Sequence, residues 1–209
     1  MGNKLLLIGG GGHCHSVLDS VIAMGKFDEI GIIDTNDCAY LGVKTVGTDD
    51  DLPGMFAEGW INAFITVGSV GNSSIRRRLY ENVKRLGYNI PTIIDPSASV
   101  AGDVRIGDGV FIGKKSVINS GAALGYCSII NTGAIIEHDC KIGSFSHISP
   151  GAILCGQVYV GNDSHIGAGT VIRQQLSIGD NTLIGAGSVV VKDIGDNIKA
   201  YGNPCKVVS

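Results

Sequence analysis

The sequence predicts two structural units: an α/β unit over residues 1–90 and an all-β unit, a parallel β-helix, over residues 91–209. Two observations carry this prediction. An aliphatic residue occupies every sixth position from Ile94 to Val190 without a miss, and a run of glycines from Gly9 to Gly12 joins an apolar segment to a helical pattern. A period of six differs from the periods of an α-helix and a strand, about 3.6 and 2, and is typical of β-helices.

A second register accompanies the aliphatic one. From Ala98 to Ser188 every sixth residue is small or β-branched, with Leu176 as the exception. Each hexad is then one short strand and one corner, and both residues point inward to form stacked columns. We expect Gly and small polar residues at the corners, because a corner needs backbone conformations that a Cβ disfavours. Three hexads close a triangular coil of about 18 residues, which gives about five coils.

The first unit begins with a strand, a turn, a helix and a strand. Residues 4–8 are an apolar run typical of a buried strand, residues 15–24 have helical periodicity, and residues 29–34 form a second strand that ends on Asp34. The glycines before the helix place backbone N–H groups at a helix N-terminus, where phosphates bind. The motif is incomplete, because Cys14 occupies the position of the last glycine in G-x-G-x-x-G.

Two further elements complete the expected α/β unit. Residues 63–68 read as a third strand, and residues 72–87 as an amphipathic helix that Asn72, Ser73 or Ser74 caps. The helix is rich in basic residues, which we expect on its outer faces: Arg76, Arg77, Arg78, Lys84 and Arg85.

Composition limits the classes of function. The net charge of −3 gives no sign of a nucleic-acid surface. No apolar run reaches the length of a membrane span, and the N-terminus lacks a signal-peptide pattern. The six cysteines contain no CxxC pair, so we expect reduced thiols. These features predict a cytoplasmic protein without membrane insertion.

His138 is the candidate catalytic residue, with Glu137 and Asp139 on either side. A neutral histidine is a suitable general base near pH 7. A carboxylate bonded to its other ring nitrogen fixes the tautomer and stabilises the imidazolium. Strand alternation sends both acidic neighbours to the face opposite His138, so spacing does not choose between them.

Two further histidines are separated by one coil. His165 follows His147 by 18 residues, so their side chains stack about 4.8 Å apart if the coil is triangular. We expect His165 to be a surface residue.

The whole chain resembles the hexapeptide-repeat, left-handed β-helix acetyltransferases, in particular the subfamily of nucleotide-sugar N-acetyltransferases and sialic acid O-acetyltransferases. The resemblance implies a Rossmann-like N-terminal domain that binds the acceptor, a left-handed coil, and a homotrimer with active sites between subunits. The matching segments are Gly9 to His13, Asp34, Gly68 to Asn72, Ile75 and Arg76, Asn131, Glu137 to Cys140, Gly143 to His147, and Gly202 to Pro204.

The resemblance also implies roles for individual residues. It makes His138 the general base and Asp139 its partner, with acetyl-CoA as co-substrate and no metal. Thr35 stands where many relatives carry a second acid. The implied acetyl-CoA contacts are His147, Gly156, Ala168 and Ala186. The implied acceptor contacts are Gly11, Gly12, His13, Asp34, Thr35 and Asn131.

Three functions remain open from the sequence. The first is acetyl-CoA-dependent N-acetylation of a nucleotide-linked amino sugar, such as a UDP-4-amino sugar, in surface glycan biosynthesis. The second is O-acetylation of sialic acid or another sugar by the same chemistry. The third is a metal-binding or non-catalytic β-helix protein, in which stacked His147 and His165 with a histidine from a neighbouring chain bind zinc.

Overall fold

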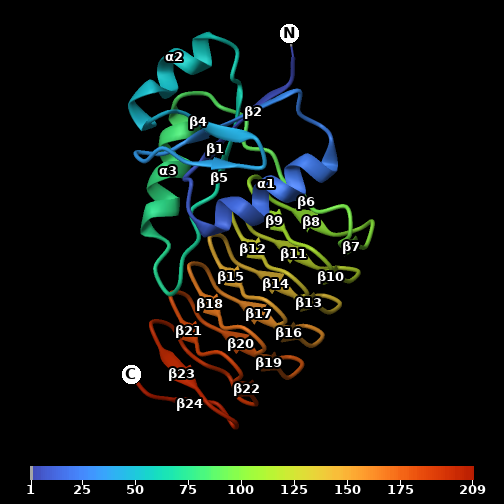
Figure 1. Cartoon of the computed structure of the whole chain (residues 1–209). Helices are drawn as coiled ribbons and strands as arrows, with labels where there is room; N and C mark the ends of the chain where they lie inside the picture. Colours follow the sequence, from blue (N-terminus) through green and yellow to red (C-terminus); the bar gives the residue numbers. More distant parts are fainter. Residues whose placement is uncertain (1) are drawn as a thin grey trace.

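A computed structural model describes residues 2–209, which form an α/β unit seated on one end and one side of a long parallel β-helix (Figure 1). The α/β unit holds a five-stranded sheet in the order β3-β4-β2-β1-β5. Its strands are β1 (Lys4–Ile8), β2 (Glu29–Ile33), β3 (Ala39–Tyr40), β4 (Val43–Gly47) and β5 (Asn62–Ile65). Only β3 runs antiparallel to its neighbour.

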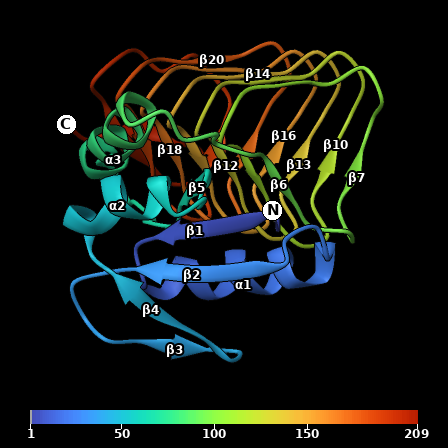
Figure 2. The ribbon, with the colours of Figure 1, turned by 90° about the horizontal axis from the view of Figure 1, so that it is seen from above.

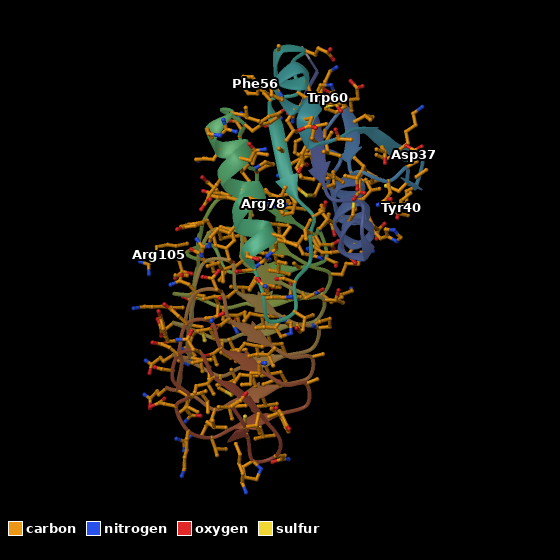
Figure 3. The ribbon with its side chains drawn as sticks, turned by 90° about the vertical axis from the view of Figure 1, so that its left-hand side faces the viewer. Asp37, Tyr40, Phe56, Trp60, Arg78 and Arg105 are labelled. Atoms are coloured by element: carbon orange, nitrogen blue, oxygen red, sulfur yellow. The ribbon has the colours of Figure 1, made fainter. Side chains whose placement is uncertain are left out.

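The helices cover both faces of this sheet. They are α1 (Gly12–Met24), α2 (Leu52–Ala57) and α3 (Ser74–Arg85), with a 3₁₀ turn at Asp49–Asp51. Because strand side chains alternate, Leu5 and Leu7 pack against α1, whereas Leu6 and Ile8 pack against α2 and α3. Phe56 and Trp60 lie at the end of this unit far from the coil, and Arg78 lies on α3 (Figure 3).

The structure confirms the first strand and shifts or adds other elements. The first helix begins at Gly12, three residues before the expected start, so the glycine run enters its first turn. The β3–β4 hairpin and α2 were not expected: these elements are short, and β3 and β4 are at most partly buried. The last helix begins at Ser74, and Asn72 Oδ1 accepts the Ser74 backbone N–H at 2.9 Å.

The β-helix consists of three sheets, named here by one central strand each; their strands are parallel except for β24, which runs antiparallel to β23. The β12 sheet contains β6 (Ile93–Ile94), β9 (Phe111–Ile112), β12 (Ile129–Ile130), β15 (His147–Ile148), β18 (His165–Ile166), β21 (Leu183–Ile184), β23 (Lys199–Tyr201) and β24 (Lys206–Val207). The β13 sheet contains β7 (Ser99–Val100), β10 (Val117–Ile118), β13 (Ile135–Ile136), β16 (Ile153–Leu154), β19 (Val171–Ile172) and β22 (Val189–Val190). The β14 sheet contains β8 (Arg105–Ile106), β11 (Ala123–Leu124), β14 (Lys141–Ile142), β17 (Tyr159–Val160) and β20 (Ser177–Ile178).

The strand register confirms a coil of 18 residues. Ile129 pairs with His147, and Ile130 with Ile148, in parallel register. The view from above shows the triangular outline of the coil, with the α/β unit along one side (Figure 2). The aliphatic column forms the core of the coil and is buried from Ile112 to Val190, where no member is more than 3 % exposed. Leu176, the exception in the small-residue register, is also buried.

The residues at the corners of the coil differ from the expectation that Gly or a small polar residue supplies each turn. Several left-handed corner positions carry larger residues, including Phe145 at φ 59° and Gln157 at φ 61°. The glycine that follows the aliphatic residue has another role. A Cβ on Gly143 would lie 2.4 Å from the carbonyl carbon of Gly161, so this glycine permits close stacking of successive coils.

The two units share an apolar junction. Helix α1 lies between the sheet and the coil, and its apolar face packs with Ile93, Phe111 and Ile129 of the β12 sheet. Ser20 of α1 donates a hydrogen bond to the buried carboxylate of Asp95 at 2.6 Å. The segment from β5 to α3 descends along the β12 sheet toward β18 and β21 (Figure 1). The position of the first unit on the coil is therefore defined by packing and by buried polar contacts.

Candidate active site

His138 lies at the corner where the β13 sheet meets the β14 sheet, a line of corners that we name the base edge. Its Nδ1 lies 2.9 Å from Asp139 Oδ2. Because a carboxylate accepts, Nδ1 carries the proton and Nε2 keeps its lone pair. The side chain of His138 is 59 % exposed, so Nε2 is open to a reactant. The left-handed conformation of Asp139 brings its carboxylate to the ring, and Glu137 makes no hydrogen bond to His138.

Gly156 lies one coil beyond His138 on the base edge. A Cβ at this position would be 2.4 Å from His138 Nε2. The backbone of Gly156 has no positive φ, so the glycine is needed for the space of the imidazole ring. His138, Gly156 and three glutamines line a pocket of about 320 Å³; the glutamines are Gln157, Gln174 and Gln175.

A second pocket, which we name the interdomain cleft, lies between the α/β unit and the coil. Its volume is about 470 Å³. It borders the corners between the β12 and β13 sheets, which we name the cleft edge. Several candidate residues line it together: Gly12, His13, Asn131 and His147, along with Gly68, Ser69 and Pro150. The cleft thus joins candidates expected to bind the acceptor with one expected to bind acetyl-CoA.

The histidines around the cleft are partly or fully buried, and desolvation favours their neutral form. Burial is the main reason that the pKa of His147 is lowered to about 3; His165 and Arg76 act in the same direction, and the hydrogen bond to Ser69 opposes them. Burial and Arg76 also lower the pKa of His13 to about 4. His165 is only 8 % exposed, so the expectation of a surface residue was wrong. Its ring centroid lies 4.9 Å from that of His147, which confirms the expected stacking of successive coils.

The glycine turn has two parts with different requirements. A Cβ on Gly9 would lie 2.5 Å from the Val67 side chain, and Gly9 has φ +106°, so the fold itself requires this glycine. Gly11 and Gly12 face open space, since a Cβ at either position would have no atom within 4 Å. The fold does not require glycine at these two positions, which leaves the approach to the start of α1 free for a ligand.

Asp34 holds the glycine turn in place. Its Oδ2 accepts the Gly10 backbone N–H at 2.7 Å, and its Oδ1 accepts the Asn36 backbone N–H at 2.8 Å. These hydrogen bonds lower the pKa of the Asp34 carboxyl. Neither Asp34 nor the exposed Thr35 is among the residues that line the interdomain cleft.

The candidate acetyl-CoA residues are divided between two edges of one chain. Ala168 and Ala186 are exposed on the cleft edge, one and two coils beyond Pro150. Gly156 is on the base edge beside His138. Strands of the β13 sheet separate the two edges, so a single chain does not bring its own His138 to its own interdomain cleft.

Arg76 was expected on an outer face of its helix and is instead buried, at 2 % exposure. Its guanidinium donates to the carbonyl oxygen of Phe145 on the coil. The neighbouring Arg77 donates to both carboxylate oxygens of Asp163, at 2.9 and 2.7 Å. The sequence indicates a helix here, but it does not show which face of the helix packs against the coil, so the burial of Arg76 could not be predicted.

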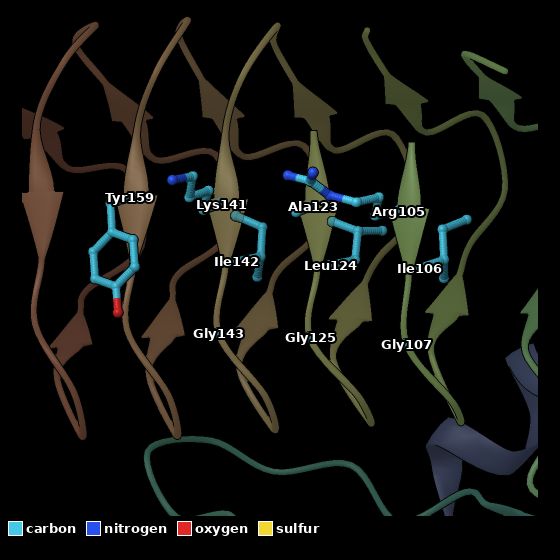
Figure 4. Close-up of a pocket in the computed structure, with 10 residues that line it drawn as sticks. All are labelled: Arg105, Ile106, Gly107, Ala123, Leu124, Gly125, Lys141, Ile142, Gly143 and Tyr159. Carbon is cyan, nitrogen blue, oxygen red and sulfur yellow. The ribbon is translucent and has the colours of Figure 1, made fainter. Parts of the chain in front are cut away.

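The outward face of the β14 sheet carries a shallow groove of about 360 Å³, lined by residues between Arg105 and Tyr159 (Figure 4). No candidate site residue lines it.

Within residues 2–209 the structure has no group of three or more His, Cys, Asp or Glu side chains suited to a metal ion. In the same range, no helix has the length and apolar character to span a membrane.

Comparison with known proteins agrees with this architecture. Residues 4–83 match the PglD N-terminal domain, and residues 139–174 and 157–192 match the bacterial transferase hexapeptide family of six repeats. Residues 103–137 match the hexapeptide repeat of succinyl-transferase. The combination defines a hexapeptide-repeat acyltransferase with a PglD-type N-terminal domain.

Solved structures narrow the family. PerB from Caulobacter crescentus, in complex with CoA and GDP-perosamine, is 36 % identical with a TM-score of 0.94, over 99 % of this chain and 98 % of that chain. The acetyltransferase domain of PglB from Neisseria gonorrhoeae, in complex with acetyl-CoA, is also 36 % identical, with a TM-score of 0.93 and full coverage of both chains at 100 %. The chain belongs to the nucleotide-sugar N-acetyltransferase family of hexapeptide-repeat enzymes.

Proposed function

We propose that this protein transfers an acetyl group from acetyl-CoA to the amino group of a nucleotide-linked amino sugar in surface glycan biosynthesis. The observation that carries the proposal is the His138–Asp139 pair, in which one ring nitrogen is held at 2.9 Å and the other is open. The similarity to the perosamine N-acetyltransferase of Caulobacter crescentus, of which a histidine-to-asparagine variant was solved in complex with CoA and GDP-perosamine, supports an amine as the acceptor and CoA as the carrier.

The chemistry is a direct transfer. His138 Nε2 accepts a proton from the sugar amine as its nitrogen attacks the thioester carbonyl carbon. The new C–N bond forms, the C–S bond breaks, and the CoA thiolate leaves and receives a proton from His138. Asp139 holds the Nδ1–H tautomer and stabilises the imidazolium while His138 carries the proton. No covalent enzyme intermediate and no metal take part in this sequence of steps.

The acceptor binds at the interdomain cleft in this proposal. The open space before Gly11 and Gly12 admits a diphosphate at the N-terminal amides of α1. His13 and Asn131 line the same cleft, next to the sugar. Asp34 and Thr35 lie further along the turn, toward the nucleoside. We assign residues 1–90 to this Rossmann-like acceptor domain and residues 91–209 to the catalytic coil.

The active site forms between chains. Because His138 is on the base edge and the interdomain cleft is on the cleft edge, the base edge of one chain must approach the cleft edge of another. A closed ring of three chains satisfies this heterologous contact at every subunit. Gly156 from one chain, with Ala168 and Ala186 from its neighbour, then borders the acetyl-CoA. We infer a homotrimer of left-handed coils in the cytoplasm, where acetyl-CoA is available.

The test is CoA release from acetyl-CoA with a panel of acceptors: UDP- and GDP-linked amino sugars, the matching nucleotide sugars with a hydroxyl in place of the amine, and free sialic acid. We expect release only with a nucleotide-linked amine. Release with the hydroxyl analogue or with sialic acid instead identifies an O-acetyltransferase. Light scattering gives the assembly: three times the chain mass of 21.7 kDa is expected, and a monomer would contradict the shared site.

A further inference from the structure

His147 makes a hydrogen bond to the protein through each of its ring nitrogens. Nδ1 lies 2.9 Å from the backbone carbonyl oxygen of Ser69, and Nε2 lies 3.1 Å from Asn131 Nδ2. A carbonyl oxygen only accepts and an amide nitrogen only donates. Nδ1 therefore carries the proton, and Nε2 offers its lone pair to Asn131. One neutral tautomer satisfies both contacts, so both ring nitrogens of His147 are hydrogen-bonded to the protein.

The side-chain amide of Asn131 has one defined orientation. Its Oδ1 accepts the Thr132 backbone N–H at 2.8 Å, and its Nδ2 donates one proton to His147. An amide nitrogen carries two protons. Among residues 2–209 no protein acceptor takes the second one, and Asn131 lines the interdomain cleft. This second N–H is therefore available to a bound molecule.

The acceptor domain controls this arrangement through one loop. The Ser69 carbonyl belongs to the segment that connects β5 to α3 and lies along the coil. Beyond it, Ser73 donates to Asp163 Oδ1, and Arg77 donates to both oxygens of the same carboxylate, at 2.9 and 2.7 Å. The loop is thus fastened to the coil, which holds the Ser69 carbonyl against His147.

We name the chain of hydrogen bonds from the Ser69 carbonyl through His147 to Asn131 the relay. Burial keeps His147 in the neutral state in which Nε2 can accept from Asn131. The desolvated ring has a pKa of about 3, in spite of the favourable hydrogen bond to Ser69. The charged or titratable groups that face it are His165, Arg76 and His13, and each of them disfavours a second proton on the ring. At neutral pH the ring therefore accepts from Asn131 and does not donate to it.

We propose that His147 is a positioning residue: together with the Ser69 carbonyl it orients Asn131 so that the free amide N–H meets an oxygen of the reacting molecules in the interdomain cleft. This inference rests on the proposed acetyl transfer. The oxygen belongs either to the acetyl carbonyl or to a hydroxyl of the acceptor sugar. The attacking amine is not the partner, because a hydrogen bond to its lone pair would oppose its attack on the thioester.

Two substitutions of His147 separate its two contacts. An asparagine side chain places an amide near the Nδ1 position, and a glutamine side chain reaches the Nε2 position. His147→Gln keeps an acceptor for Asn131, whereas His147→Asn keeps only a donor for Ser69. We expect His147→Asn to lose about tenfold to hundredfold in activity and His147→Gln to lose only a few-fold. Equal losses, or a greater loss in His147→Gln, would overturn the proposal.

The kinetic constants identify the oxygen. A loss in kcat assigns the acetyl carbonyl, since its charge develops only in the transition state, and a loss confined to KM for the nucleotide sugar assigns a sugar hydroxyl. The double variant Asn131→Ala with His147→Asn should be no less active than Asn131→Ala alone, because His147 acts only through Asn131. Additive losses would contradict this dependence.

Nitrogen NMR of the imidazole tests the relay without any assay of activity. In the wild-type protein we expect His147 to be neutral with its proton on Nδ1 throughout about pH 5 to 8. A proton on Nε2 would overturn the proposal whether or not the protein acetylates an amino sugar. Conversely, the expected tautomer in a protein that acetylates no amine would leave the relay intact and remove the proposed function.

Discussion

Substitution of Gly156 by alanine tests whether the ring of His138 must stay where the structure places it. The added Cβ would lie 2.4 Å from His138 Nε2, about 1 Å inside the ordinary contact range, which begins at 3.4 Å. A ring displaced by about 1 Å separates from Asp139 Oδ2, now at 2.9 Å, and its Nε2 is covered by the methyl group. General base catalysis contributes about 10²–10⁴-fold, so we expect kcat to fall by about a hundredfold.

The fold should tolerate this change. The side chain of His138 is 59 % exposed and can move into solvent, and Gly156 needs no left-handed backbone. We expect the free energy of unfolding to change by less than about 0.5 kcal/mol. Gly102 is a matched control, because it lies on the same base edge three coils earlier and a Cβ there meets no atom within 4 Å.

The assay is the rate of CoA release at saturating acetyl-CoA, together with denaturant unfolding of both variants. Saturation removes any effect of Gly156→Ala on acetyl-CoA affinity from the comparison. We expect Gly102→Ala to behave as the wild type. A Gly156→Ala variant with the wild-type kcat would refute the reasoning, because it would show that catalysis does not need His138 in this position.

Three further predictions concern the pair, the junction and acid stability. Asp139→Asn removes the anion that holds His138 Nδ1–H, so kcat should fall about tenfold to a thousandfold while denaturant unfolding stays unchanged; a wild-type kcat would contradict the pairing. Arg76→Ala leaves the Phe145 carbonyl without its buried donor, and denaturant unfolding should show a loss of about 2–4 kcal/mol. The lowered pKa of His147 means that the unfolded chain binds a proton below about pH 6.5 and the folded chain does not until about pH 3. The contribution of His147 to the free energy of unfolding should therefore be complete above about pH 6.5 and should fall by about 1.4 kcal/mol for each pH unit between about pH 6.5 and about pH 3. In His147→Asn the midpoint of denaturation should depend less on pH.

The coil could be predicted because its signal is periodic and local. An inward aliphatic residue at every sixth position determines the strands, the register and the 18-residue coil, and the structure confirms each of them. The β3–β4 hairpin has no such signal, because Val43 to Gly47 lies near an edge of the sheet with partly exposed side chains. Short elements that are stabilised by tertiary contacts leave little trace in hydrophobic patterning.

The candidate site was harder to predict, because it depends on contacts between units. Arg76 and His165 have spacing that fits an exposed position, but both are buried in the folded chain, where Arg76 donates to the Phe145 carbonyl of the coil. The roles of Asp139 and Glu137 could not be separated by strand alternation. The left-handed backbone of Asp139, a feature of the corner, brings its carboxylate to His138.

The most direct test of the central claim is a comparison of the wild type with His138→Ala, using acetyl-CoA and a nucleotide-linked amino sugar. CoA release is measured beside acetyl-CoA affinity by calorimetry. We predict that His138→Ala loses at least about a hundredfold in kcat and binds acetyl-CoA as the wild type does. Undiminished CoA release by His138→Ala, with an intact fold, would contradict the assignment of His138 as the base.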